Sequence, residues 1–327
     1  MRRYLGVDGG GSKTRFLLID EAGGVLASHT EGSAYYLEIG LDGLTALLSR
    51  GIGSVLEQGR VRTQDVAFAF LGLPAYGEDR ALLATLDAAP SAALGAGRYR
   101  CGNDMVCGWA GALAGEDGIN VVAGTGSIAY GEYQGRHARA GGWGELFSDE
   151  GSAHWVAREG LRVFSRMSDG RTARGPLHAL MRGHFALDCD LDICAAIYGK
   201  TAAQRSQVAQ LSRLVAEAAR AGDDEARALF GRAAEELAEL VDAVRLALAV
   251  PGQRVLPVSC TGGMFELREL MREPLEAALA GRTRPYRLVP PRLPPEAGAA
   301  LHAAKLGGVP LGAGAIGALE RELDGAA

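Results

Sequence analysis

The sequence predicts an α/β protein built from two domains of similar plan. With 327 residues the chain is too long for one ordinary domain and long enough for two. Apolar, strand-like runs alternate with helical stretches, as in α/β proteins. A strand, a glycine-rich turn and a second strand open the chain as LGVDGGGSKTRFLLID (5–20), and the same order returns as INVVAGTGSIAYGEYQG (119–135). This weak internal repeat indicates two related halves.

The first half is expected to begin with a meander of three strands and to continue with alternating helices and strands. Runs of apolar and β-branched residues bounded by turn residues mark its strands. These strands are 3–8, 14–20, 25–30, 66–73 and 98–104. Helical stretches are expected around 41–58, over EDRALLATLDAA (78–89) and directly after residue 104.

After the repeated unit, residues 151–250 are expected to be mostly helical. Val208, Leu211 and Val215 form an i, i+3, i+7 stripe that predicts an amphipathic helix packed on the core. A final strand is expected at 254–260, and proline near the start of PPEAGAALHAAKLGG with glycine after it predicts a terminal helix. We therefore expect one domain over 1–104 with the terminal helix 295–327, and a second over 105–294 with a helical insertion.

Composition excludes several classes of partner. Lys and Arg number 34 against 39 Asp and Glu. The net charge of −5 therefore gives no excess of positive charge for binding nucleic acid or an anionic membrane. No apolar run approaches the length needed to span a bilayer. The five cysteines suit reduced thiols in the cytoplasm. The sequence leaves a homodimer open.

The opening glycine cluster is not a Walker A loop, because Ser12 separates Gly11 from Lys13. A tight turn between two strands presents successive backbone N–H groups to one point, and glycines leave that point unblocked. Two hydroxyls could add donors, and Asp8 could orient a hydrated magnesium ion. The expected phosphate site is Asp8, Gly9, Gly10, Gly11, Ser12 and Thr14. An ordinary glycine-rich hairpin is the alternative.

The second hairpin has a similar glycine-rich turn, formed by Gly124, Thr125, Gly126 and Ser127. Two such turns facing across a cleft could hold the β- and γ-phosphates of a nucleotide. A third element, Thr261 followed by Gly262 and Gly263, lies between a strand and a helix, where small residues let a flat adenine approach the backbone.

Together, DGGGSKT, Asn103-Asp104, AGTGS (123–127), GGWGELFSDEGSAHW (141–155) and TGGMF (261–265) resemble the actin, Hsp70 and sugar kinase superfamily. The chain is most similar to the branch that joins N-acetylglucosamine kinases with ATPase activators of acyl-CoA dehydratases and reductases. The resemblance implies two actin-like (ribonuclease H-like) α/β domains with a cleft between them. It also implies ATP and Mg²⁺ as cofactors, and transfer of phosphate to the 6-hydroxyl of an amino sugar.

The resemblance makes Asp104 the catalytic base, although an Asp before a helix that begins near Met105 could instead be its N-cap. It implies sugar contacts by Asn103, Asp104, Ser127, Gly142, Trp143, Gly144, Asp149 and Tyr35. Trp143 could equally be a core residue, and Asp149 could belong to the acidic start of a helix at 151–166. Tyr35 and Ile128 stand where many relatives and the animal enzymes, respectively, have Asn. N-acetylglucosamine, glucosamine and muramyl sugars therefore stay open.

The alternatives to a kinase are an iron–sulfur ATPase activator and a sensor without turnover. Iron–sulfur ATPase activators of this branch have a Cys shortly before the GTG loop, where this chain has Val121. Neither Cys101 and Cys107 nor Cys189 and Cys194 have metal-ligand spacing, so these cysteines are expected to be small buried hydrophobes. The second rival is a sensor that binds sugar and nucleotide without turnover, and a retained Asp104 argues against it.

Overall fold

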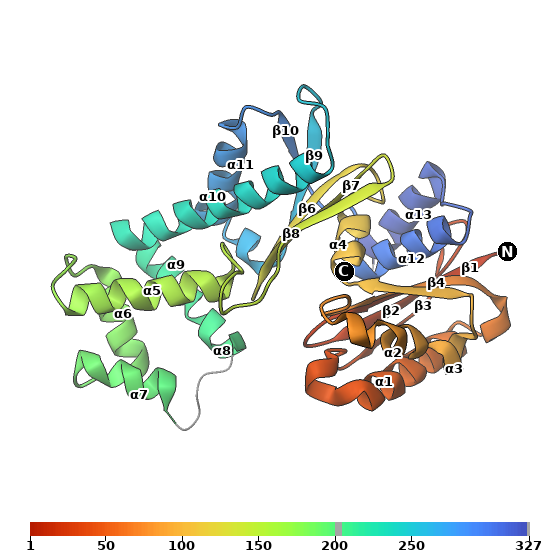
Figure 1. The fold of residues 1–327 in the computed structure, drawn as a ribbon, viewed down its shortest axis with the longest axis horizontal. Helices are drawn as coiled ribbons and strands as arrows, with labels where there is room; N and C mark the ends of the chain where they lie inside the picture. Colours follow the sequence, from red (N-terminus) through yellow and green to blue (C-terminus); the bar gives the residue numbers. More distant parts are fainter. Residues whose placement is uncertain (200–204, 326–327) are drawn as a thin grey trace. The chain divides into compact units, whose positions relative to one another are not determined.

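A five-stranded mixed sheet forms the centre of each of two units in the computed structural model, which describes residues 1–199 and 205–325 (Figure 1). Unit 1 comprises Met1–Asp117 and Pro290–Ala327, and unit 2 comprises Gly118–Val289. Residues 200–204 of the predicted helical stretch and 326–327 of the predicted terminal helix lie outside the described residues.

Unit 1 has the strand order β3-β2-β1-β4-β5, in which β1, β2 and β3 are antiparallel and β1, β4 and β5 are parallel. The strands are β1 (Arg3–Gly9), β2 (Thr14–Asp20), β3 (Val25–Glu31), β4 (Val66–Leu73) and β5 (Tyr99–Asn103). The helices are α1 (Tyr36–Gln58), α2 (Leu83–Ala88), α3 (Ser91–Leu94), α4 (Met105–Ala112), α12 (Pro295–Leu306) and α13 (Ala313–Asp324), with 3-10 turns at Thr63–Asp65 and Arg80–Leu82.

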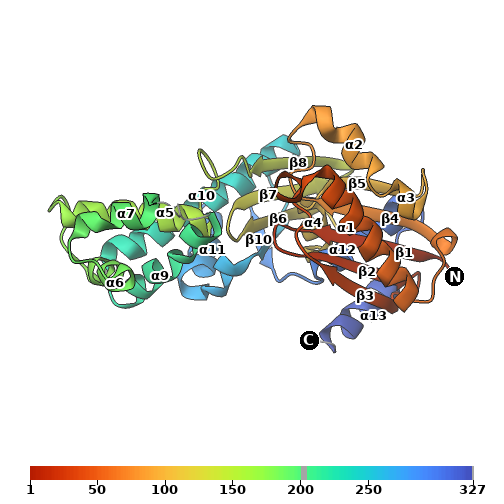
Figure 2. The same cartoon turned by 90° about the horizontal axis from the view of Figure 1, so that it is seen from below.

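Both faces of this sheet are covered, which explains why its strands read as continuous apolar runs. Alternate residues point to opposite faces. Leu5 and Phe16 pack in the core under α1, whereas Tyr4 and Leu17 pack in the core under α12. Figure 2 shows α1 along the β2–β3 side of the sheet. By length and composition α1 could also cross a membrane, but its buried side chains form part of this core.

Unit 2 repeats the topology with the order β10-β9-β6-β7-β8, which confirms the internal repeat. Its strands are β6 (Gly118–Ala123), β7 (Ser127–Tyr133), β8 (Arg136–Gly141), β9 (Leu256–Thr261) and β10 (Tyr286–Val289). Its helices are α5 (Ala153–Ser168), α6 (Pro176–Phe185), α7 (Ile193–Tyr198), α8 (Arg205–Gln210), α9 (Ser212–Arg220), α10 (Asp224–Ala247) and α11 (Glu273–Ala280), with 3-10 turns at Asp190–Asp192 and Gly263–Glu266 and a π-helical turn at Arg268–Arg272.

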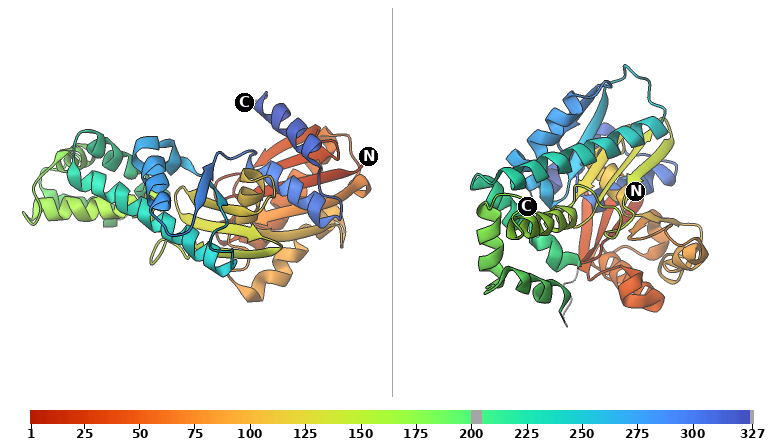
Figure 3. Two further views of the ribbon diagram at one scale, coloured as in Figure 1. Left: turned by 90° about the horizontal axis from the view of Figure 1, so that it is seen from above. Right: turned by 60° about the vertical axis from the view of Figure 1, so that its left-hand side comes forward.

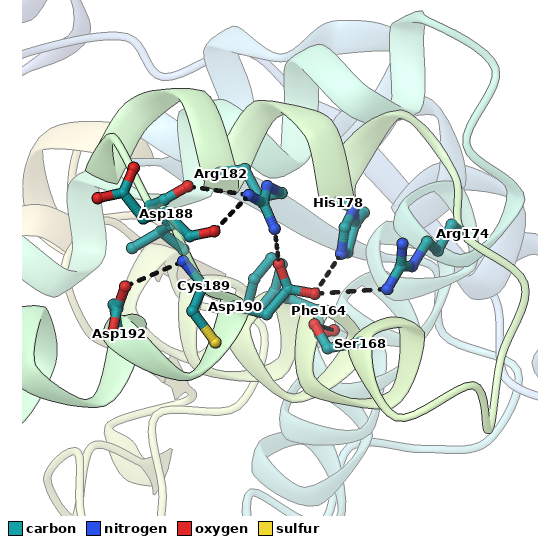
Figure 4. A network of polar contacts seen from close by, with 10 residues as sticks. Phe164, Ser168, Arg174, His178, Arg182, Asp188, Cys189, Asp190 and Asp192 are labelled. Atoms are coloured by element: carbon teal, nitrogen blue, oxygen red, sulfur yellow. Dashed lines mark hydrogen bonds and ion pairs between the residues drawn. The ribbon is translucent and has the colours of Figure 1, made fainter.

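The long helix α10 packs against β6, β7 and β8, and α5, α6 and α9 extend this core away from the sheet (Figure 3). A polar network holds the outer helices together (Figure 4). Asp190 accepts hydrogen bonds from Arg182 and from His178 Nε2 at 2.9 Å, and Arg174 lies 3.6 Å away. The His178 ring stacks on Phe164 at 5.2 Å. These partners lower the pKa of Asp190 to about 2, the His178 hydrogen bond contributing most.

Three features differ from the sequence expectations. Strand β8 was not expected, and the terminal helix is two helices, because α12 ends at Leu306, where Gly307 is the C-cap and Gly308 follows with φ +84°. Unit 1 continues past Asp104, the predicted end of the first domain, because α4 packs against α12. A Cβ on Gly298 would lie 2.1 Å from the Gly111 nitrogen, so the two helices meet backbone to backbone.

Candidate active site

The carboxyl ends of β1, β4 and β5 meet at one edge of the unit 1 sheet. Asp8 pairs with Gly72 across β1 and β4, and Gly72 pairs with Gly102 across β4 and β5. Asp104 follows β5 directly. Since neighbouring strands lie about 4.8 Å apart, this register brings Asp8 and Asp104 to the same edge, two strands apart. Gly72 between them makes the close approach possible, because a Cβ there would lie 3.0 Å from the Asp104 Cα.

Asp8 lies in a negatively charged environment. Burial, followed by the charges of Asp104 and Glu296, raises the pKa of Asp8 to about 7, although Arg15 and Lys13 oppose the shift. Glu296 belongs to the first turn of α12, where its side chain is 15% exposed and one oxygen lies 3.5 Å from Arg15 Nη1. A divalent cation would relieve this repulsion, and carboxylate oxygens are the ligands that Mg²⁺ prefers.

Asp104 has a raised pKa and, among the described residues, no helix-capping side-chain hydrogen bond. Burial raises its pKa to about 6, and the neighbouring Met105 backbone N–H acts in the opposite direction. Although Asp104 occupies the N-cap position of α4, its side chain makes no cap hydrogen bond within the part of the chain that the structure describes. The Met105 amide donates instead to Asn103 Oδ1 at 3.1 Å. The cap interpretation is therefore wrong.

Asn103 has structural partners on both sides of its amide. Besides accepting from Met105, its Nδ2 donates to the Tyr76 carbonyl oxygen at 3.2 Å, and the residue is buried. The structure thus gives Asn103 a role in joining β5 to α4 and to the segment after β4. Tyr35, another expected sugar contact, precedes α1, and its partly buried side chain packs against the core under that helix.

The β1–β2 turn presents an exposed tip over residues 11–13. The Gly10 amide donates to the Lys13 carbonyl oxygen at 3.0 Å, which closes the turn, and the Ala34 amide donates to the Gly10 oxygen at 3.0 Å. Thr14 is fully buried, and its hydroxyl donates to the Gly32 oxygen at 2.8 Å. This bond gives Thr14 a structural role in place of the expected phosphate contact, whereas Ser12 is exposed at the tip with Gly11.

The β6–β7 turn of unit 2 is fastened to the start of α5. The Gly124 amide donates to the Gly126 oxygen at 2.9 Å, and the Gly124 oxygen accepts from the Ala153 amide at 2.8 Å. Thr125 is exposed at the tip. Ser127 is buried, and its hydroxyl donates to the Glu150 carbonyl oxygen at 2.6 Å, so it supports the 141–152 segment.

That segment contains the expected sugar-contacting residues. Gly142 and Gly144 have positive φ values of 69° and 96°, which glycine adopts without strain. Trp143 is 67% exposed, so the alternative that it belongs to the core is wrong. The Arg139 guanidinium lies 5.4 Å from its ring centre.

Asp149 is buried, with a positive φ of 62° that is uncommon for a residue other than glycine. Its Oδ1 accepts from the Ser127 amide at 3.4 Å, and its Oδ2 contacts Arg205. Burial raises the pKa of Asp149, while Arg205 opposes that shift. The helix α5 is capped by Ser152, which accepts from the Trp155 amide at 3.1 Å, so Asp149 is not its cap.

The third glycine element follows β9. A Cβ on Gly262, which has φ +101°, would lie 2.4 Å from the Ala123 carbonyl oxygen at the end of β6. Gly263 is exposed, and a Cβ there would meet no atom within 4 Å. Gly262 therefore allows β9 to pass close to β6, and Gly263 leaves open backbone beside it.

All five cysteines are free thiols in the structure. Val121, at the position of the expected cluster cysteine, is buried in β6. Cys101 and Cys107 are buried as expected, whereas Cys189 and Cys194 are exposed, so the prediction that they are buried hydrophobes is wrong. Over residues 1–199 and 205–325, no three His, Cys, Asp or Glu side chains lie close enough to share a metal ion.

Sequence reasoning missed two charged residues of these sites, Glu296 beside Asp8 and Arg205 beside Asp149. Glu296 directly follows the prolines that mark the start of a helix, and a search for carboxylates at helix starts could have found it. Arg205 carries no sequence signal, because its contact with Asp149 depends on the tertiary fold.

Two sheets of identical order, each with a glycine-rich turn between its central antiparallel strands, define the actin-like class of α/β protein. The chain belongs to the BadF/BadG/BcrA/BcrD ATPase family, whose model matches residues 5–303.

Three similar proteins carry kinase names. The chain is 26% identical to the N-acetyl-D-glucosamine kinase of Dictyostelium discoideum over 307 residues, which cover 91% of this chain and 96% of the relative. It is 27% identical to the N-acetylmuramic acid/N-acetylglucosamine kinase of Clostridium acetobutylicum over 279 residues, covering 84% and 89%. A solved structure of a proposed N-acetylglucosamine kinase from Chromobacterium violaceum superposes with a TM-score of 0.71, 29% identity and coverage of 92% and 98%.

Proposed function

We propose that this protein is an ATP-dependent kinase that phosphorylates the 6-hydroxyl of an amino sugar, N-acetylglucosamine or glucosamine. The observation that carries this proposal is Asp104, a carboxylate at the end of β5 whose pKa is raised to about 6. The kinase names of relatives that match most of the chain support the substrate class. The free cysteines suit an enzyme of the reducing cytoplasm.

The residues of unit 1 fit a hydrated magnesium ion. Asp8 and its negative neighbours would be stabilised by a divalent cation, and Asp8 would hold that ion through water. Magnesium supplies charge neutralisation at the transferred phosphoryl group. We assign phosphate contacts to the backbone of Gly9, Gly10, Gly11 and Ser12 in one turn and of Gly124, Thr125 and Gly126 in the other, with Gly262 and Gly263 for the adenine.

Asp104 would act on the sugar hydroxyl. The 6-oxygen forms the new bond to the γ-phosphorus of ATP while the bond from that phosphorus to the β–γ bridging oxygen breaks, and ADP leaves. The hydroxyl proton passes to the Asp104 carboxylate. A base with a pKa near 6 is ionised at neutral pH, yet it is basic enough to accept this proton.

On the sugar side, Asp149 would accept hydrogen bonds from ring hydroxyls. Trp143, with the backbone of Gly142 and Gly144, would contact the ring face. Tyr35 would contact a substituent of the sugar. Asn103 and Ser127, whose polar atoms have partners in the fold, would act by supporting Asp104 and the Asp149 segment.

A coupled ADP-release assay over a panel of hexoses and amino sugars tests the function. We expect Mg²⁺-dependent ADP formation that rises above the water background only with amino sugars. We also expect turnover to fall as the pH drops through about 6, because protonated Asp104 cannot accept the proton. A panel without a stimulating sugar would refute the kinase, and a brown, iron-containing preparation would favour an iron–sulfur ATPase activator.

A further inference from the structure

Arg205 joins two carboxylates of the 141–152 segment to the β6–β7 turn. It is the first residue of α8, and its guanidinium contacts Asp149 Oδ2. Its Nε lies 3.4 Å from Glu145 Oε2. A Cβ on Gly126 would lie 2.4 Å from Arg205 Nη2 and 2.9 Å from Asp149 Oδ2, so this ion pair packs directly on the turn. Any side chain at Gly126 would displace it.

The protonation state of Asp149 depends on its contact with Arg205. The Asp149 side chain is only 3% exposed, and a buried carboxylate is costly unless it is paired. Burial raises its pKa, and Arg205 is the foremost of the groups that lower it. The other titratable groups near it are Glu145, which raises the pKa of Asp149, and His154 on α5, whose own pKa is lowered by burial and by Arg205. The Ser127 amide is the remaining donor to the carboxylate.

We propose that Arg205 is a positioning residue for the amino-sugar acceptor, because its guanidinium holds the Asp149 carboxylate ionised and oriented so that its free lone pairs can accept from sugar hydroxyls. This role rests on the function proposed above. One Asp149 oxygen faces the Ser127 amide and the other faces Arg205, so the two contacts together fix the plane of the carboxylate. These two contacts use two of the about four acceptor positions of the carboxylate.

Loss of this contact has a signature that differs from simple loss of stability. If Asp149 binds the sugar equally in the ground and transition states, weakening it raises KM for the sugar and leaves kcat nearly unchanged. The effect must also depend on pH, because without Arg205 the buried carboxyl takes up a proton more readily and a protonated oxygen no longer accepts.

The test uses Arg205→Met, Arg205→Lys and the control Arg162→Met in the full-length protein. Arg162 lies on α5, is 71% exposed and pairs with Glu159 at 3.3 Å, so its loss removes a charge from unit 2 away from Asp149. For Arg205→Met we expect KM for the sugar to rise about tenfold or more at pH 6.5, the cost of weakening a charge-assisted hydrogen bond. This increase should shrink as the pH approaches 9, with kcat within about threefold of wild type. Arg205→Lys should recover much of the loss, and Arg162→Met should match wild type.

Carbon-13 NMR titration of the Asp149 carboxyl group, assigned with Asp149→Asn, gives a readout independent of activity. Arg205→Met should raise the pKa of Asp149, and Arg205→Lys should raise it less. An unmoved titration, or a KM increase that is the same at every pH, would overturn the role of Arg205. If wild-type protein phosphorylates no sugar, the proposed function fails, while the titration still decides whether Arg205 holds Asp149 ionised. If Arg205→Met does not fold, the comparison of Arg205→Lys with wild type decides the same question.

Discussion

Replacing Asp8 with Asn should stabilise the ligand-free protein, and increasingly so as the pH rises. The pKa of Asp8 is about 7 in the folded chain against an ordinary value of 3.8, so the folded state binds more protons and its stability falls as the pH rises from about 4 to 7. At pH 8 ionisation of Asp8 therefore costs roughly 4 kcal/mol relative to the unfolded chain. Asp8 is partly exposed, and allowing for solvent screening we expect about 2 kcal/mol.

Calorimetry of the wild type and Asp8→Asn at pH 5 and pH 8 measures this effect. A gain of about 2 kcal/mol raises the melting temperature of a domain of this size by about 4–8 °C, and the gain at pH 5 should be less than half as large. Asp42→Asn, an exposed substitution on α1, should leave the melting temperature unchanged. With Mg²⁺ and ATP the wild type should regain stability that Asp8→Asn cannot. An equal gain at both pH values, or a loss at pH 8, would refute the electrostatic reasoning.

Three further substitutions test the base, a buried cation and the outer helices. Asp104→Asn should lower turnover by about 10²–10⁴ and leave sugar binding nearly intact by calorimetry, whereas lost affinity with preserved turnover would reverse the assignment. Arg245→Met should destabilise the protein by about 3 kcal/mol or more in urea unfolding, because fully buried Arg245 donates to four backbone carbonyls, while exposed Arg254→Met should change little. Equal destabilisation by Arg245→Met and Arg254→Met would contradict a stabilising role for the buried Arg245 hydrogen bonds. Asp190→Asn should be less stable than wild type at pH 5, and the difference should disappear as the pH falls through about 2, where Asp190 is protonated in both states. A difference that persists at pH 1.5 would assign the loss to packing.

The sequence predicts most of the fold where side-chain pattern decides the structure. The meander of β1, β2 and β3 was expected because its strands are apolar runs bounded by turn residues. Strand β8 was not predicted, because its sequence RHARAG has few apolar residues. It pairs only with β7 at the edge of the sheet, where a strand needs few of them. The expected terminal helix 295–327 included α13, but its division from α12 was missed, although Gly307, Gly308 and Pro310 mark a helix end there.

The candidate site was predictable to the extent that its residues sit at the ends of strands. Asp8 lies near the end of β1 and Asp104 directly follows β5, and the register across Gly72 places them at one edge. The partners of Asp149 were not predictable, because Arg205 reaches it from a helix far along the chain. Contacts of this kind depend on how helices pack, which hydrophobic periodicity does not specify.

The two units share one strand order, but the charges beside their glycine-rich turns differ. The β6–β7 turn of unit 2 packs against an Arg205–Asp149 pair, in which charges balance locally. The β1–β2 turn of unit 1 lies beside Asp8, with Asp104 and Glu296 close enough to raise its pKa, and Arg15 is already drawn to Glu296. Such a set of carboxylates repels the phosphates of a nucleotide unless a cation is bound with them. We therefore expect phosphate binding at unit 1 to depend on a divalent cation, and phosphate binding at the β6–β7 turn of unit 2 to depend on one less.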